Sequence, residues 1–144
     1  MILNIEEIKK IIPHRDPFLF LNSLEIIEDN NKGIGKMIFN ENDYFFEGHF
    51  PNNPIVPGVV IVEAMAQTAG VVVSQKLSKN HDQSVLFMSI NKAKFRKPVL
   101  PNYKIIFYVE LLNNLKNVYK FLGKAYHNDA IVAESEFSAM ITSK

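Results

Sequence analysis

The longest apolar run of the chain, from Val59 to Val73, has the pattern of a buried helix. Its only polar side chains are those of Glu63, Gln67 and Thr68. Glu63 and Gln67 are four residues apart and therefore lie on the same face of a helix. Because the other faces are apolar, we expect this helix, from about residue 57 to residue 77, to be covered by the rest of the fold.

A second, shorter helix is predicted at the amino terminus. Asn4 can accept a hydrogen bond from its first turn, where Glu6 and Glu7 favour the positive end of the helix dipole. The proline at position 13 is expected to end it. Its apolar stripe consists of Ile5, Ile8, Ile11 and Ile12.

Most of the remaining chain has the pattern of β strands. In residues 103–112 the side chains alternate with a period of two, which places Ile105, Phe107 and Val109 on one face. Further strands are expected at residues 18–22, 23–28, 34–40, 84–95, 118–126 and 131–141, with a turn at 29–33 and the last four long strands in meander order. One long helix and a run of antiparallel strands predict an α+β domain in which a curved sheet covers the helix.

Length and composition indicate one domain with a partner interface. The chain has 144 residues, of which 47% are hydrophobic and 11 are phenylalanine. A net charge of +1 gives no reason to expect nucleic acid binding, and a chain without cysteine has no disulfide or catalytic thiolate. The amino terminus lacks a secretory signal, and Pro57, Glu63 and Gln67 interrupt the apolar run. We therefore expect a cytoplasmic protein without a membrane span.

One histidine and one carboxylic acid are the candidate catalytic groups. His49 lies in a loop restricted by Pro51, Pro54 and Pro57, and a stiff loop can aim an imidazole. The carboxyl of Glu63, among apolar neighbours, tends to stay protonated, as a general acid must near neutral pH. We predict an acid/base pair. The alternatives are a loop histidine that bonds to the backbone and a buried acid satisfied by a structural partner.

Three neighbouring positions are expected to help bind a substrate. Gly58 and Val59, at the start of the long helix, would present free backbone N–H groups to an anion or a developing oxyanion. The alternative is that Pro57 and Gly58 only initiate the helix. The side-chain amide of Gln67 is expected to hold the carboxyl of Glu63 in one orientation.

Four basic residues surround Phe95: Lys92, Lys94, Arg96 and Lys97. They indicate either a solvated strand edge or a docking site for an acidic protein. His14, Arg15 and Asp16 are expected to form a turn or an ion pair. The histidines lack metal-ligand spacing, and dinucleotide, phosphate-loop and serine-elbow motifs are missing, so we predict no metal and no cofactor.

Four motifs together resemble those of one enzyme family. Residues 48–59 read GHFPNNPIVPGV and residues 63–67 read EAMAQ, with PHRDPF at 13–18 and KFRKPV at 94–99. These motifs closely resemble those of the (3R)-hydroxyacyl-[acyl-carrier-protein] dehydratases of bacterial type II fatty acid synthesis. The resemblance spans most of the chain. It implies a hot-dog fold, in which an antiparallel sheet wraps a central helix, and dimers that often assemble into hexamers.

The resemblance also implies roles for the candidate residues. His49 would take the proton next to the thioester carbonyl, Glu63 would protonate the departing 3-hydroxyl, and the Gly58 amide would polarise the thioester oxygen. In this family the two residues that face one substrate come from different subunits. Related dehydratase-isomerases carry Asp at the acid position, so Glu63 implies dehydration without isomerisation. The basic cluster would suit an acidic acyl carrier protein with its phosphopantetheine-linked acyl group.

Two positions depart from the family pattern. Residues 100–103, LPNY, replace the common Pro-Gly-Asp, although Asn102 can keep the turn because asparagine tolerates left-handed geometry. Asn22 stands where the family often has Asp. Alternatives on the same fold are an acyl-CoA thioesterase and an enoyl-CoA hydratase. An alternative from another class is a non-catalytic acyl-thioester-binding module.

Overall fold

The computed structural model of the protein describes residues 1–27, 31–75 and 83–143. Its helices are α1 (Ile5–Lys9), the 3-10 helix η1 (Tyr44–Glu47) and α2 (Gly58–Ser74). Its strands are β1 (Ile2–Asn4), β2 (Ser23–Ile27), β3 (Lys32–Ile38), β4 (Gln83–Phe95), β5 (Lys104–Leu115), β6 (Val118–His127) and β7 (Ala130–Ser143).

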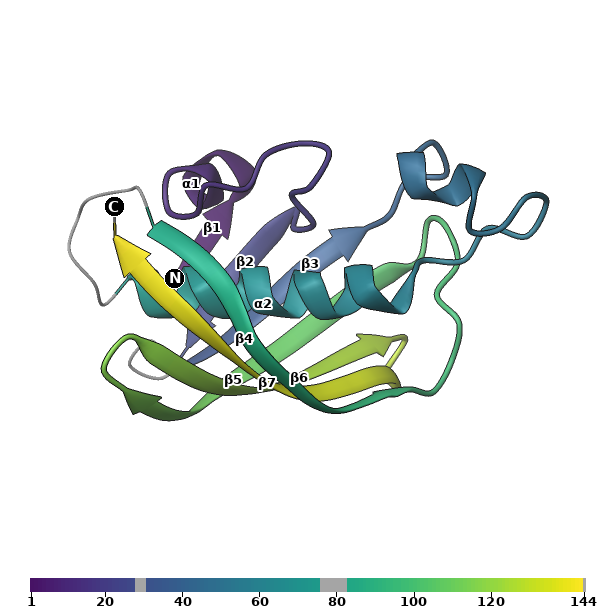
Figure 1. Cartoon of the computed structure of the whole chain (residues 1–144). Coiled ribbons are helices and arrows are strands. Elements are labelled where there is room, and N and C mark those ends of the chain that lie inside the picture. Colours follow the sequence, from purple (N-terminus) through teal and green to yellow (C-terminus); the bar gives the residue numbers. More distant parts are fainter. Residues whose placement is uncertain (28–30, 76–82, 144) are drawn as a thin grey trace.

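The described strands form one antiparallel sheet that curves around α2 (Figure 1). Their order is β1-β2-β3-β5-β6-β7-β4. The helix packs against β3, β5, β6, β7 and β4, and from Val60 to Ser74 all of its residues except Glu63 are buried. The predicted α+β architecture, a long helix wrapped by a curved sheet, is therefore confirmed. No helix of the described part of the chain is long and apolar enough to cross a membrane.

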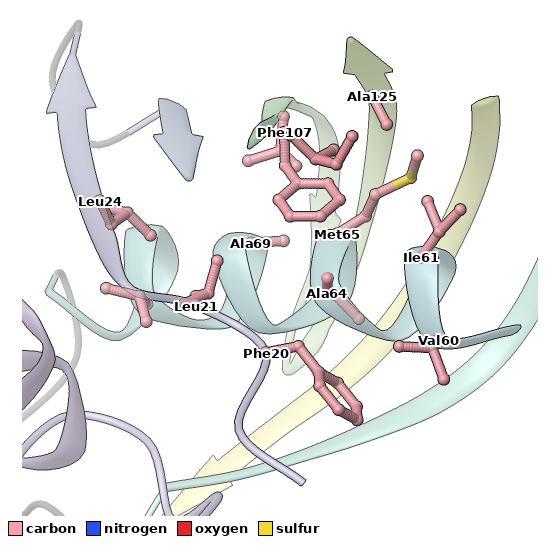
Figure 2. Close-up of a cluster of buried hydrophobic side chains, with 14 of the residues drawn as sticks. Phe20, Leu21, Leu24, Val60, Ile61, Ala64, Met65, Ala69, Phe107 and Ala125 are labelled. Atoms are coloured by element: carbon pink, nitrogen blue, oxygen red, sulfur yellow. The ribbon is translucent and has the colours of Figure 1, made fainter. Parts of the chain in front are cut away.

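The core fills the space between α2 and the sheet. Met65 and Ala69 of α2 point into the same cluster as Phe107 of β5 (Figure 2), and each is almost completely buried. Ile105 and Val109, two residues to either side of Phe107, are buried as well. The predicted period of two in this strand is confirmed.

Gly35 of β3 allows the sheet to approach α2 closely. A Cβ atom at this position would lie 2.6 Å from Oγ1 of Thr68 and 2.8 Å from Cδ2 of Leu21, too close for non-bonded atoms. We expect Gly35→Ala to lower the free energy of unfolding by about 1–3 kcal/mol, as measured by urea denaturation. The matched control is Gly48→Ala, whose Cβ would meet nothing within 4 Å. Equal losses in the two variants would contradict this packing argument.

Two expectations about the strands are wrong. Residues 18–22 form no strand, because the backbone of Phe18 and Phe20 bonds to the side chain of Gln67 instead of to a neighbouring strand. The last four strands are not a meander: β5, β6 and β7 pair in sequence, but β4 pairs with β7 at the sheet edge. The chain passes through α2 before it forms β4 at that edge. The strand that pairs with β3 is therefore β5 and not β4.

The ends of several elements also differ from the predictions. The first helix ends at Lys9, short of the proline at position 13, although Asn4 caps it as expected, in a capping box with Glu7. The helix α2 ends at Ser74, and residues 76–77 lie outside the described part, as do residues 28–30 of the expected strand and turn. Asn102 has a φ of 69°, which confirms the left-handed turn expected there.

Candidate active site

The side chain of Gln67 holds Glu63 in one orientation. Gln67 is fully buried, and its Oε1 accepts a hydrogen bond from the Phe20 N–H at 2.8 Å. Its Nε2 donates to the Phe18 carbonyl at 2.9 Å and to Oε2 of Glu63 at 3.0 Å. The two backbone partners fix which end of the amide faces the carboxyl. Glu63 is the one partly exposed side chain on this stretch of α2, with 17% exposure.

A histidine from the amino-terminal segment lies next to the same carboxyl. The Nε2 atom of His14 is 3.5 Å from Oε2 of Glu63, and its side chain is only 13% exposed. The other ring nitrogen, Nδ1, is buried and has no hydrogen-bond partner in the described part of the chain. Of the two alternatives for residues 14–16, the turn is present, since the Phe18 N–H donates to the Arg15 carbonyl at 2.7 Å.

The ring of His49 is oriented by the backbone of its own loop. Nδ1 lies 2.8 Å from the carbonyl oxygen of Ile55. A carbonyl only accepts, so Nδ1 carries the proton of this bond, and in the neutral ring the lone pair is on Nε2. The ring also stacks on Phe50, with centroids 4.1 Å apart. The backbone bond that was the alternative to catalysis is present, and it leaves Nε2 available as a base.

The start of α2 presents backbone donors beside this histidine. Pro57 is the N-cap and provides no side-chain cap, and its carbonyl accepts from the N–H groups of Val60 and Ile61. Within the described residues, no hydrogen bond involves the N–H groups of Gly58 or Val59. Both residues line the same pocket as His49. This geometry agrees with the predicted role in binding an oxyanion.

His49 and Glu63 open into two different pockets of the single chain. The first pocket, of about 420 Å³, is lined by His49, Gly58 and the segment from Phe95 to Val99. The second, of about 460 Å³, is lined by Glu63 and by apolar side chains, including Phe18 and Phe87. The predicted pair is therefore not brought together within one chain. Val59 and Phe95 line both pockets, so the two pockets lie next to each other.

Phe95 is a site residue that the sequence interpretation assigned only to the basic cluster. Its ring covers the start of α2, since a Cβ atom on Gly58 would lie 2.7 Å from it. Phe95 is 52% exposed and lines both pockets. The signal in the sequence was a large aromatic residue within a run of lysine and arginine.

The edge strand β4 exposes a row of large apolar side chains. Those at least one-third exposed are Leu86, Phe87, Met88, Ile90 and Phe95. Only β7 pairs with β4 in the described sheet, so the backbone on the other side of β4 is unpaired. A long apolar edge of this kind is normally covered by another chain. This edge is the exposed apolar surface of the described chain that best suits the partner interface expected from the composition.

The basic cluster is partly neutralised by acids on β7. Lys92 lies 3.3 Å from Glu136, and Arg96 donates to Glu134 at 3.0 Å. The hydrogen bond from Arg96 holds the pKa of Glu134 below its usual value. The basic residues thus form the expected solvated strand edge, and two of them, Arg96 and Lys97, also line the pocket that contains His49. No group of three potential metal ligands occurs among the described residues.

Comparison with known proteins identifies relatives along nearly the whole chain. A sequence model of the FabA-like domain matches residues 12–136. Similar proteins include the 3-hydroxyacyl-[acyl-carrier-protein] dehydratases FabZ of Syntrophotalea carbinolica, 41% identical over 97% of this chain and 95% of that protein, and of Sulfurimonas denitrificans, 40% identical over the full length of both. The corresponding protein of Granulibacter bethesdensis is 45% identical over 97% of this chain and 83% of its own length.

Solved structures show the fold. The dehydratase heterocomplex ApeI:P from Xenorhabdus doucetiae has a TM-score of 0.79 over 95% of this chain and 91% of that chain, at 14% identity. A homologue of HP0420 from Helicobacter felis has a TM-score of 0.65 over 90% and 93%, at 15% identity. The architecture is the expected hot-dog fold.

Proposed function

Because this chain belongs to the FabA-like family, we propose that it dehydrates (3R)-hydroxyacyl thioesters of acyl carrier protein to trans-2-enoyl thioesters in fatty acid elongation. Its FabZ relatives carry this activity in their names. The observation that carries the proposal is that each candidate group is held by one hydrogen bond that leaves a reactive atom free. His49 keeps Nε2, and Glu63 keeps Oε1, each beside an apolar pocket.

The chemistry follows from these two atoms. Nε2 of His49 takes the proton from C2, next to the thioester carbonyl, and the released electron pair forms the C2–C3 double bond. The C3–O bond breaks as Glu63 gives its proton to the departing hydroxyl, which leaves as water. Negative charge that develops on the thioester oxygen is stabilised by the Gly58 N–H at the positive end of α2. No cofactor is required.

We propose that the complete site forms between two subunits that pair through β4. His49 of one subunit and Glu63 of the other would then face one substrate, since the two pockets adjoin at Val59 and Phe95 beside the apolar edge. Val59 is 77% exposed in the single chain and would be covered by the pairing. Assembly of three such dimers into a hexamer is the larger state to be tested by sedimentation.

We propose further that the acyl carrier protein docks at Lys92, Lys94, Arg96 and Lys97, in the cytoplasm. Arg96 and Lys97 lie at the His49 pocket, so a bound carrier would deliver its acyl chain there. Attraction between exposed charges weakens with added salt. The KM for the carrier substrate should therefore rise with ionic strength, whereas the KM for a short thioester without the carrier should not.

Assay of the purified protein without added cofactor tests the activity. A 3-hydroxyacyl thioester on the acyl carrier protein should be converted to an enoyl product that absorbs in the near ultraviolet. Release of free thiol instead would indicate a thioesterase, and preference for a CoA ester would favour an enoyl-CoA hydratase. Binding of the thioester without turnover would indicate a non-catalytic acyl-thioester-binding module.

Replacing Gln67 is expected to lower the stability of the protein. Gln67→Leu leaves the buried Phe20 N–H and Phe18 carbonyl without partners, which should lower the free energy of unfolding by about 2–4 kcal/mol. Thr68→Val is the matched comparison, because it removes one buried hydrogen bond, to the Ala64 carbonyl, at a cost of about 1 kcal/mol. Urea denaturation measures both, and similar losses would contradict the assigned role of Gln67.

A further inference from the structure

His14 contacts the proposed acid without being part of the acid/base pair, and we infer that it is a positioning residue for the proton of Glu63. This inference rests on the proposed function and adds a group to that same site. Its starting point is that two side chains, His14 and Gln67, approach the same oxygen of Glu63, Oε2.

Gln67 determines which oxygen of Glu63 can carry the proton. Both hydrogens of its Nε2 are used, one by the Phe18 carbonyl and the other by Oε2, while its Oε1 is occupied by the Phe20 N–H. The amide cannot be turned without breaking both backbone bonds, so it always presents N–H to Oε2. Oε2 is therefore an acceptor, and the acidic proton is on Oε1.

His14 adds a second donor to the accepting oxygen. Its Nδ1 is buried without a partner in the described chain, so an imidazolium would bury an unpaired N–H. The neutral ring with its hydrogen on Nε2 avoids this cost, and that hydrogen faces Oε2 of Glu63 across 3.5 Å. The distance is longer than a good hydrogen bond, as is common for catalytic contacts before substrate binds.

The contact gains strength during the reaction. When Oε1 releases its proton to the departing hydroxyl, Glu63 becomes a carboxylate, and hydrogen bonds to a charged acceptor are stronger than those to a neutral one. His14 then stabilises the product state of the proton transfer and holds Oε1 toward the substrate. Solvent returns a proton to Glu63 and removes one from His49 before the next turnover. His14 itself neither gains nor loses a proton.

The segment around His14 is built to hold the ring in place. The Arg15 guanidinium donates to the carbonyls of Ile12 at 3.0 Å, His14 at 2.7 Å and Lys9 at 2.8 Å. These bonds fix the backbone independently of the imidazole. The motif at residues 13–18 thus contributes His14 to Glu63 directly and the Phe18 carbonyl through Gln67. Replacement of the imidazole should leave this loop folded.

Steady-state kinetics of His14→Leu and His14→Gln test the inference. Leucine removes the donor, and kcat should fall by about 10- to 100-fold with KM changed by less than about twofold. Glutamine places an amide nitrogen near the position of Nε2 and should keep kcat within about threefold of the unsubstituted protein. Equal loss in both variants, or no loss in His14→Leu, would overturn the donor role.

A double-mutant cycle and a crystal structure separate positioning from general stability. In a Glu63→Gln background, His14→Leu should cause no further loss of kcat, because it acts through Glu63. An additive loss would overturn the inference. In the crystal structure of the His14→Leu protein we expect the carboxyl of Glu63 to turn about its remaining hydrogen bond to Gln67, so that Oε1 no longer points in one direction. An unmoved Glu63 would refute the positioning role even if the unsubstituted protein shows no dehydratase activity, whereas that missing activity alone would refute only the proposed function.

Discussion

His49→Ala and Glu63→Gln are each expected to lower kcat by about 10²–10⁴-fold, the usual contribution of a general acid or base. Alanine removes the Nε2 lone pair that is proposed to accept the C2 proton. Glutamine can still present a carbonyl oxygen to Gln67, so the hydrogen bond at Oε2 persists while the proton on Oε1 is lost. The rise of enoyl absorbance in the near ultraviolet measures both variants.

The control for these two variants is His127→Asn. His127 stacks on Tyr103, with ring centroids 3.8 Å apart, and lines neither the His49 pocket nor the Glu63 pocket. Its kcat should match that of the unsubstituted protein. If Glu63→Gln turns over at the normal rate, Glu63 is not the acid.

Mixing the two inactive variants should restore activity, which is the second large effect. If each site takes His49 from one subunit and Glu63 from the other, a dimer of one His49→Ala chain and one Glu63→Gln chain has one intact site and one doubly altered site. Random exchange makes half of the dimers mixed, so about a quarter of the normal activity should return. Against the residual activity of either variant alone, this is a rise of about 25-fold or more.

Tagged subunits allow the mixed dimers to be purified and assayed. Chains with different affinity tags are refolded together or exchanged, and only dimers that carry both tags are kept. The control is a mixture of two His49→Ala chains with different tags, which should remain inactive. Verified mixed dimers that stay inactive would show that the site is not shared between subunits.

The pattern of apolar and polar residues was sufficient to predict the helix and most of the sheet. The run from Val59 to Val73 is apolar on nearly all faces, and such a run is stable in water only inside a fold, so its central position followed directly. The alternation at Ile105, Phe107 and Val109 likewise identified the buried face of β5. These are local patterns whose period depends only on backbone geometry.

The errors arose where tertiary contacts replaced the local pattern. Residues 18–21 are apolar and look like a strand, but the Phe18 carbonyl and the Phe20 N–H bond to the side chain of Gln67, more than 40 residues away. The position of β4 beside β7 was also not local, because pairing partners depend on where the chain crosses the helix. Neither contact leaves a periodic signal in the sequence.

The candidate site, like the fold, was predicted only in part from the sequence. The sequence by itself determined the residue types: a histidine in a proline-restricted loop, a carboxylic acid in an apolar helix, and an amide four residues later on the same helix face. Only the tertiary structure decided that His14 contacts Glu63, that Nδ1 of His49 is bonded and Nε2 is free, and that the two candidate groups open into adjacent pockets. The physical reason is that residue spacing fixes neighbours along one helix or strand, whereas contacts between distant segments depend on how the sheet wraps α2.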